Sequence, residues 1–187
     1  AKLKMGESIV IFGAGGIGLN IIQASKLSSA WPIIAVDLYQ NRLELAKKLG
    51  ATHTINSSLE DPDLKIKEIT KNNKLDVFID NTGIPSIIEM GYKLVSTSGR
   101  VILVGVPKHN ADIKIYSLPL HFGLQLKGSY GGESNPSKDI PRYLNMLEKG
   151  IWDIEGLITE RYKLKDINKA ISSMREGKTA GRVIIEL

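Results

Sequence analysis

The residues best placed to do chemistry are the glycines of the segment GAGGIG at residues 13–18, which fits the spacing G-x-G-x-x-G. By itself this spacing also arises in ordinary glycine turns. Here it follows an apolar run at 8–12 that predicts a buried strand, and it precedes a segment in which Ile17, Ile21 and Ala24 recur at helical spacing. A glycine loop between a strand and a helix is the arrangement that binds a pyrophosphate.

Each glycine of this loop has a physical role in that arrangement. Gly13 would let the chain turn sharply after the strand, Gly15 would let the backbone approach a phosphate, and Gly18 would let the helix pack closely on the sheet. Free N–H groups and the positive end of the helix dipole stabilise an anion there without a basic side chain. None of these six residues is basic. We therefore predict a dinucleotide site, with an ordinary glycine turn as the alternative.

Asp37 is the candidate partner of this loop. It follows a second apolar run at 32–36, about 20 residues after Gly18, where the dinucleotide-binding motif places an acid. A carboxylate there accepts hydrogen bonds from both hydroxyls of the adenosine ribose and repels a 2′-phosphate, so we predict NAD rather than NADP. Alternatively, Asp37 caps the turn into a helix that begins near Tyr39. Arg42 either leans toward the ribose or lies on a solvated helix surface.

The elements that must position these residues alternate along the chain. Apolar runs and helical spacing predict strands at 8–12, 32–36, 53–55, 75–79, 100–104 and 124–130, and helices at 17–28, 43–49, 61–73 and 85–94. Strands that alternate with helices indicate a parallel sheet covered on both faces, because parallel neighbours need crossover connections. The predicted fold class is therefore α/β, with a doubly wound parallel sheet and helices on both faces.

The last part of the chain differs from this alternation. Gly, Ser, Asn and Pro are common at 131–137, which we interpret as a linker. A strand at 182–187 follows two further helices and ends the chain. We therefore predict a dinucleotide-binding domain at 1–130 and a short C-terminal α/β segment at 131–187 that packs on it.

The two helices of this segment are predicted from their caps. Asp139 is the candidate cap of the first helix, and Pro141 is tolerated in a first turn, where backbone donors lack intrahelical partners. Asp166 is the candidate cap of the second helix, and Gly177 is its predicted end.

Composition excludes several classes of chemistry. The chain has 187 residues and no cysteine, so it holds no disulfide, no thiolate nucleophile and no cysteine zinc site. His53, His109 and His121 are widely separated, so we predict no metal site. The net charge of +5 comes from scattered lysines, and no apolar run approaches the roughly 20 residues of a membrane-spanning helix. We expect no nucleic-acid partner, no membrane partner and a cytoplasmic location.

Six segments of the sequence carry a resemblance to a known family. They are VIFGAGGIGLN at 10–20, VDLYQNRLELAKKLGATHTIN at 36–56, DNTG at 80–83, VILVGVP at 101–107, LKGSYGG at 126–132 and ITERYKLKDINKAISSMREGKTAGRVII at 158–185. Together they resemble the coenzyme-binding Rossmann domain of the zinc-containing medium-chain alcohol dehydrogenases, with their polyol and threonine dehydrogenase relatives. The resemblance spans nearly the whole chain.

The resemblance implies cofactor contacts on the adenosine and pyrophosphate side. It implies that Gly15, Gly16 and Ile17 contact the pyrophosphate, that Asp37 contacts the adenosine ribose and that Arg42 lies near it. These contacts agree with the interpretation from the residues themselves.

The resemblance also implies contacts on the nicotinamide side. Thr82 and Gly83 would pass close to the cofactor's ribose, and Val104, Gly105 and Val106 would lie against the nicotinamide. For both valines, plain core packing is the alternative.

Two later residues complete the implied site. Ser129 would contact the carboxamide of the nicotinamide, and Arg182 would reach the pyrophosphate. Alternatively, Arg182 opens a surface strand and needs no function.

One part of the family's pattern is missing from this sequence. Family members carry, before this region, a GroES-like domain that supplies the catalytic zinc ligands and the proton relay. We therefore expect an excised fragment or a truncated gene product that binds NAD(H), has no catalytic residue of its own and has zinc only in the absent domain. The C-terminal segment would return to that domain. The implied substrate of the whole enzyme is a small alcohol or polyol, oxidised by hydride transfer to the nicotinamide.

Two other functions remain open, and so does the oligomeric state of the chain. One alternative is a regulatory or redox-sensing module that binds NAD without catalysis. The other is an S-adenosylmethionine methyltransferase, although such enzymes usually carry an acid at the end of the first strand and Ile9–Phe12 offers none. We also predict a homodimer through the edge of the sheet, which we expect at 100–106 with the segment 111–115.

Overall fold

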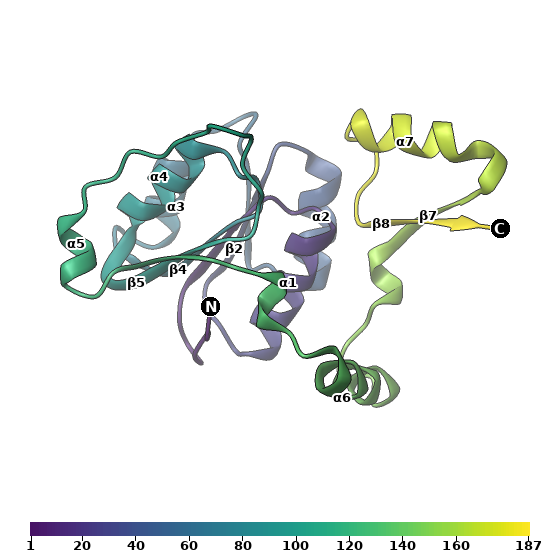
Figure 1. Ribbon diagram of the computed structural model, residues 1–187, viewed down its shortest axis with the longest axis horizontal. Coiled ribbons are helices and arrows are strands. Elements are labelled where there is room, and N and C mark those ends of the chain that lie inside the picture. The colour runs from purple at the N-terminus through teal and green to yellow at the C-terminus, as the bar shows by residue number, and fades with distance from the viewer. The chain divides into compact units, whose positions relative to one another are not determined.

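The computed structural model describes residues 1–187, which form two compact units at 1–129 and 130–187. The first unit contains a six-stranded sheet and the helices that cover it, and the second contains a two-stranded sheet and two longer helices. Figure 1 shows the elements of both units along the chain.

All six strands of the first unit are parallel. From one edge to the other they are β3 (His53–Asn56), β2 (Ile33–Asp37), β1 (Ile9–Phe12), β4 (Leu75–Asp80), β5 (Val95–Leu103) and β6 (Gln125–Gly128). The chain builds the sheet outward from β1 in one direction and then crosses back to β4 on the other side of β1. The order therefore reverses between β1 and β4, which is the switch point where a doubly wound sheet binds its ligand.

Helices cover both faces of this sheet, as the sequence predicts. They are α1 (Gly16–Leu27), α2 (Gln40–Leu49), α3 (Pro62–Ile69), α4 (Pro85–Leu94) and the short α5 (Leu118–His121). Figure 1 shows α1 and α2 on one side of the strands and α3 and α4 on the other. The predicted α/β fold with a doubly wound parallel sheet is confirmed.

The core beneath α3 and α4 is built from alternate residues of the strands. Val10 and Phe12 of β1 point to this face, and the ring of Phe12 lies 6.1 Å from that of Phe78 between centroids. Gly91 of α4 allows the helix to approach, because a Cβ there would lie 2.3 Å from the Phe78 ring. The inner strands are thus buried on both faces, which explains their continuous apolar runs.

The helix predicted at 17–28 is confirmed as α1, but the residues whose spacing indicated it do not form its buried face. Ile17 is 53% exposed and Ala24 is exposed, whereas Leu19 and Ile22 are buried. Gly18 lets the helix rest on the preceding loop, since a Cβ there would lie 2.0 Å from the carbonyl oxygen of Gly13.

The predicted sheet edge at 100–106 is also wrong. β5 pairs with β4 on one side and with β6 on the other, where Arg100 faces Gln125 in register. The edge is therefore β6, and the segment 111–115 forms no strand. The strand predicted at 124–130 corresponds to β6, but apolar spacing along the chain does not reveal that this strand pairs with β5.

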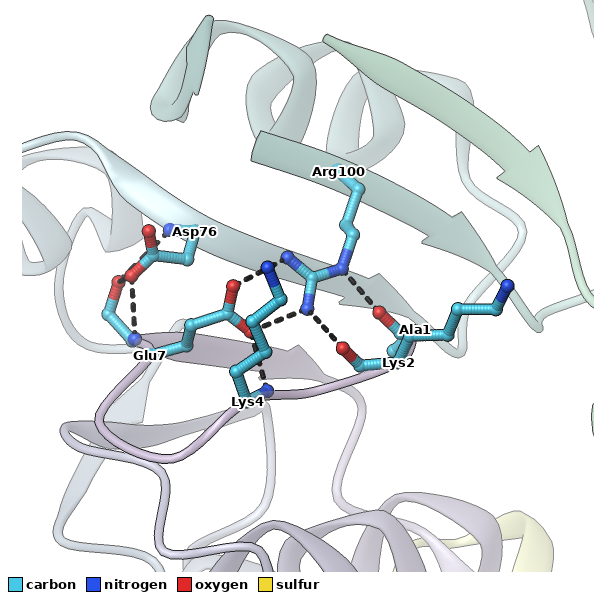
Figure 2. Close-up of polar contacts among 7 residues, drawn as sticks. Ala1, Lys2, Lys4, Glu7, Asp76 and Arg100 are labelled. Atoms are coloured by element: carbon cyan, nitrogen blue, oxygen red, sulfur yellow. Dashed lines mark hydrogen bonds and ion pairs between the residues drawn. The ribbon is translucent and has the colours of Figure 1, made fainter. Parts of the chain in front are cut away.

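An ion pair joins the start of the chain to β5 at the opposite end of the sheet from the switch point (Figure 2). The guanidinium of Arg100 donates to the two carboxylate oxygens of Glu7 at 3.0 and 2.6 Å, and it also donates to the carbonyl oxygens of Ala1 and Lys2. Both charged side chains are largely buried, at 12% and 18% exposed. The hydrogen bond from Arg100 lowers the pKa of Glu7, against the opposing effect of burial.

The second unit contains α6 (Pro136–Glu148), β7 (Ile158–Lys163), α7 (Ile167–Arg175) and β8 (Arg182–Glu186). The two strands pair in parallel, with Arg161 opposite Ile184. Several apolar side chains of its helices are exposed, namely Ile140, Tyr143, Leu144, Ile171 and Met174.

Of the two predicted caps of this unit, Asp139 is wrong and Asp166 is confirmed in position. α6 begins after Asn135, not at Asp139, so Pro141 lies inside the helix instead of in its first turn. Asp139 instead accepts a hydrogen bond from the N–H of Asn135 at 2.7 Å. Asp166 does precede α7, but its side chain makes no cap hydrogen bond, because it pairs with Lys169 at 2.8 Å.

We predict that Glu7→Gln lowers the free energy of unfolding by about 1–2 kcal/mol at neutral pH, because it leaves the Arg100 guanidinium without its carboxylate. Since the folded pKa of Glu7 is depressed, the stabilisation is present at neutral pH and is lost as the pH falls through that folded pKa. Urea unfolding of the wild type and the variant at pH 7 and at about pH 3 measures the loss of stability and its dependence on pH. Glu44→Gln, at an exposed position on α2, is the control and should leave the free energy of unfolding unchanged at both pH values. An equal loss at both pH values would contradict the ion-pair explanation.

Candidate dinucleotide-binding site

The predicted site residues of the first unit gather at one edge of its sheet. Because all strands are parallel, the segments that follow their carboxyl ends share that edge. These segments carry Gly13–Gly18 after β1, Asp37 at the end of β2, Thr82 and Gly83 after β4, Val104–Val106 after β5 and Ser129 after β6.

The glycine loop leaves the first N–H groups of α1 available. Gly13 turns the chain with φ +96°, and its N–H donates to the carbonyl oxygen of Val36 at 2.8 Å. Gly15 precedes the helix without a side-chain cap, and the first turn contains no acid. The first hydrogen bond of the helix runs from Leu19 to Gly15 at 2.9 Å, so the N–H groups of Gly16 and Ile17 have no partner in the chain.

The space over this helix end fits a diphosphate. A Cβ built on Gly15 would meet no atom within 4 Å, so the backbone there is open to a ligand. Unpaired N–H groups and the positive end of the helix dipole together favour an anion. The loop thus offers both the room and the donors that a pyrophosphate needs, and it does so without a basic side chain.

Asp37 fastens the loop to the second strand. It is 6% exposed, and its carboxylate accepts hydrogen bonds from the N–H of Ala14 at 2.8 Å and of Tyr39 at 3.0 Å. The bond to Tyr39 is the turn cap that was the alternative interpretation, and the bond to Ala14 is one the sequence did not suggest. Each carboxylate oxygen can accept a further hydrogen bond, so these two bonds are compatible with binding a ribose hydroxyl.

Arg42 lies beside this carboxylate. Its guanidinium nitrogen is 3.8 Å from Asp37, and its guanidinium carbon is 4.7 Å from the centroid of the Tyr39 ring. The side chain is 24% exposed, so it is held against the end of β2 instead of extending into solvent. Of the two alternatives for Arg42, this position corresponds to the one near the expected ribose.

Asp80 holds the turn that follows β4, and it is not among the site residues predicted from the sequence. One oxygen of its fully buried carboxylate accepts hydrogen bonds from the N–H of Thr82 at 2.9 Å and its hydroxyl at 2.6 Å. The other accepts from the N–H of Gly83 at 2.9 Å. The signal was present in the sequence, because an aspartate followed by Asn-Thr-Gly at the end of an apolar strand is typical of a side-chain-stabilised turn.

The segment after β5 packs directly on that turn. The N–H groups of Val104 and Gly105 donate to the backbone carbonyl oxygen of Asp80 at 2.8 and 2.9 Å. A Cβ on Gly105 would lie 2.3 Å from the nitrogen of Gly83, so only glycine fits there. Val104 is half-buried and Val106 is 89% exposed, so neither valine belongs to the buried core.

Asn81 links the end of β4 to the glycine loop. Its backbone N–H donates to Phe12 at 2.9 Å, and its side-chain amide donates to the carbonyl oxygen of Gly13 at 3.2 Å. Its side-chain oxygen is buried and has no partner in the chain. The two strands at the switch point are therefore held together by side chain as well as backbone.

Two predicted residues lie further along the chain. The N–H of Ser129 donates to the carbonyl oxygen of Leu103 at 2.8 Å, which fixes this residue at the same sheet edge. Arg182 is exposed and begins β8 in the second unit, so its contact with a pyrophosphate stays a prediction.

No group of three or more His, Cys, Asp or Glu side chains is arranged to hold a metal ion in residues 1–187. His53 lies on β3, and its ring nitrogen is 2.9 Å from the hydroxyl of Thr52. None of the helices is long and apolar enough to span a bilayer.

A family model described as "Zinc-binding dehydrogenase" matches residues 16–149. The chain belongs to the zinc-binding dehydrogenase family. The matched region contains α1 and all of the sheet except β1. Membership confirms the resemblance drawn from the sequence and does not support the methyltransferase alternative.

Known proteins resemble this zinc-binding dehydrogenase chain both in sequence and in structure. It is 34% identical to L-threonine 3-dehydrogenase of Pyrococcus horikoshii, and the match covers 97% of this chain and 52% of the relative. Benzyl alcohol dehydrogenase from Acinetobacter calcoaceticus superposes with a TM-score of 0.91 at 34% identity, covering 100% of this chain and 51% of that one. The chain therefore spans about half the length of the relatives that it matches.

One solved relative of this zinc-binding dehydrogenase chain holds a dinucleotide. It is a zinc-binding dehydrogenase from Sinorhizobium meliloti bound to NADP, with a TM-score of 0.82 and 25% identity. The match covers 100% of this chain and 54% of that one.

We predict that Gly18→Ala lowers the free energy of unfolding by about 2–3 kcal/mol, because its Cβ would overlap the carbonyl oxygen of Gly13. Gly15→Ala is the matched variant in the same loop. Gly15 has φ −73° and open space around its Cβ, so this change should shift stability by less than about 0.5 kcal/mol. Urea unfolding followed by circular dichroism measures both, and equal effects of the two alanines would contradict the loop geometry.

Proposed function

We propose that this chain is the nicotinamide dinucleotide-binding part of a zinc-type alcohol dehydrogenase and that it prefers NAD(H) to NADP(H). The observation that carries the proposal is the open amino end of α1, where unpaired N–H groups of Gly16 and Ile17 lie at the switch point of a doubly wound sheet. Membership of the zinc-binding dehydrogenase family supports the same function.

The proposed cofactor would lie across the carboxyl edge of the sheet. Its pyrophosphate would accept hydrogen bonds from the N–H groups at the start of α1. Its adenosine ribose would donate to Asp37, beside Arg42, and its second mononucleotide would extend over the ends of β4 and β5. The bound nicotinamide supplies hydride transfer, while the residues of this chain bind the cofactor, orient it and exclude water from one side of it.

The preference for NAD(H) rests on the charge of Asp37. A 2′-phosphate on the adenosine ribose would approach a buried carboxylate, and that repulsion disfavours NADP(H). Arg42, 3.8 Å from the same carboxylate, offsets part of this repulsion. The Sinorhizobium meliloti relative is bound to NADP, so membership of the family does not by itself decide between the two cofactors.

The proposed reaction of the whole enzyme is oxidation of an alcohol or reduction of a carbonyl. The relatives named for L-threonine and benzyl alcohol support an alcohol as the substrate class. No metal-holding group occurs in this chain, so no step of the proposal uses a metal held by it. A homodimer remains a proposal, and the two edge strands of the sheet are β3 and β6.

We predict that the purified chain binds NADH and does not reduce NAD with alcohols by itself. Gly15→Val should weaken NADH binding at least about tenfold, because its side chain would occupy the space that the pyrophosphate needs. Fluorescence titration with NADH measures the affinity, and circular dichroism checks that the variant is folded. An unchanged NADH affinity in folded Gly15→Val would argue against the pyrophosphate site.

We predict that Asp37→Asn shifts the cofactor preference toward NADPH. The substitution keeps the size of the side chain but removes the charge that repels the 2′-phosphate. The ratio of the two dissociation constants, NADPH over NADH, should fall by about tenfold in parallel titrations. The ratio is the decisive quantity, because loosening of the glycine loop would weaken both cofactors equally. If the ratio stays constant, Asp37 serves only to cap the turn at Tyr39 and to hold the glycine loop through the N–H of Ala14.

A further inference from the structure

Asp80 is the buried carboxylate on which two segments of the site depend. Asp80 is 0% exposed and makes no ion pair. Its carboxylate accepts hydrogen bonds from the N–H and hydroxyl of Thr82 and from the N–H of Gly83. A buried carboxylate without a cation needs such donors, because an uncompensated charge is costly in a low-dielectric interior. The backbone around Thr82 and Gly83 is therefore held in the one shape that presents all three donors.

The same residue also fixes the neighbouring segment. Its backbone carbonyl oxygen accepts the N–H groups of Val104 and Gly105 at 2.8 and 2.9 Å. The two segments then interlock, since a Cβ on Gly83 would lie 2.5 Å from the carbonyl oxygen of Val106. A shift of the turn at 82–83 must therefore move the segment at 104–106 with it.

These two segments belong to one half of the site. A doubly wound sheet binds a dinucleotide across its switch point, with one mononucleotide on each half of the sheet. Asp37 and the glycine loop occupy the half made by β1, β2 and β3, whereas the segments held by Asp80 follow β4 and β5. The Asp80 carboxylate accepts hydrogen bonds only from residues of the second half.

We propose that Asp80 is a positioning residue for the second mononucleotide of the cofactor, the one that carries the nicotinamide, and that it leaves the adenosine half unaffected. The inference rests on the proposed function and deepens it. Asp80 does not touch the cofactor, and it acts through the backbone of Thr82, Gly83, Val104 and Gly105. It therefore controls how well NADH binds without controlling how well its adenosine diphosphate portion binds.

The experiment compares NADH with ADP, which lacks the second ribose and the nicotinamide, by isothermal titration calorimetry. Asp80→Asn keeps the size of the side chain but replaces one accepting oxygen by a donor that faces an N–H group. We expect the dissociation constant of NADH to rise about tenfold and that of ADP to change by less than about twofold.

Asp76→Asn is the matched control on the same strand. Asp76 is the second residue of β4, at the far end from the site, and its carboxylate accepts hydrogen bonds from the N–H and hydroxyl of Ser8, both at 2.8 Å. This variant loses comparable structural hydrogen bonds, so it reports the effect of a loosened strand. We expect the ratio of the NADH and ADP dissociation constants to stay at the wild-type value.

A second pair of variants tests the same contact if Asp80→Asn does not fold. Thr82→Val removes only the hydroxyl that donates to Asp80 at 2.6 Å, and Thr82→Ser retains it. We expect the valine variant to lose NADH affinity several-fold with ADP unchanged, and the serine variant, which keeps the donated hydroxyl, to bind NADH several-fold more tightly than the valine variant does.

The outcomes separate this inference from the proposed function. If the wild type binds neither NADH nor ADP, the proposed function fails. If it binds NADH but not ADP, the division into two halves fails, and the inference with it. If both ligands bind the wild type and the Asp80 and Thr82 variants weaken ADP as much as NADH, or weaken neither, the inference is overturned. Selective loss of NADH affinity, absent in Asp76→Asn, supports it.

Discussion

The structure depends on how closely α1 approaches the end of β1. The carbonyl oxygen of Gly13 occupies the space that a side chain on residue 18 would need, so Gly18 alone allows the helix to begin where it does. That position leaves the N–H groups of Gly16 and Ile17 unpaired at the switch point of the sheet. Unsatisfied donors at a helix end are ordinarily met by a cap, by water or by a ligand. The proposed cofactor site follows from this constraint.

Two buried carboxylates hold the rest of the site around that helix end, one on each side. Asp37 is bonded to the N–H of Ala14 and fastens the glycine loop to β2. Asp80 holds the turn at 82–83 through its carboxylate, and its backbone carbonyl oxygen accepts hydrogen bonds from the segment after β5. Between them, the amide of Asn81 joins the two sides through Gly13. Binding on either side therefore rests on backbone that aspartate side chains hold in place.

The sequence predicted the sheet and its helices because the inner strands are buried on both faces and so appear as continuous apolar runs. Gly13, Gly15, Gly18 and Asp37 were found because their spacing follows from the strand, turn and helix that carry them. The buried face of α1 did not follow from apolar spacing, because the exposed side of the helix carries apolar Ile17 while Leu19 and Ile22 are buried. Asp80 was missed although its side-chain partners, Thr82 and Gly83, are close in sequence, and only its backbone contacts with the segment after β5 depend on the fold. The place of β6 outside β5 and the start of α6 at Pro136 were not predicted, because neither follows from apolar spacing along the chain.

The most direct test of the central claim is the response of individual backbone amides to the cofactor. A titration of the isotopically labelled chain with NADH, followed by proton–nitrogen correlation spectra, reports on each N–H group separately. The account predicts that the amide signals of Gly16 and Ile17 move the most, because these N–H groups acquire the diphosphate as their acceptor. If these two signals stay in place while NADH binds elsewhere, the amino end of α1 is not the binding site and the account is contradicted.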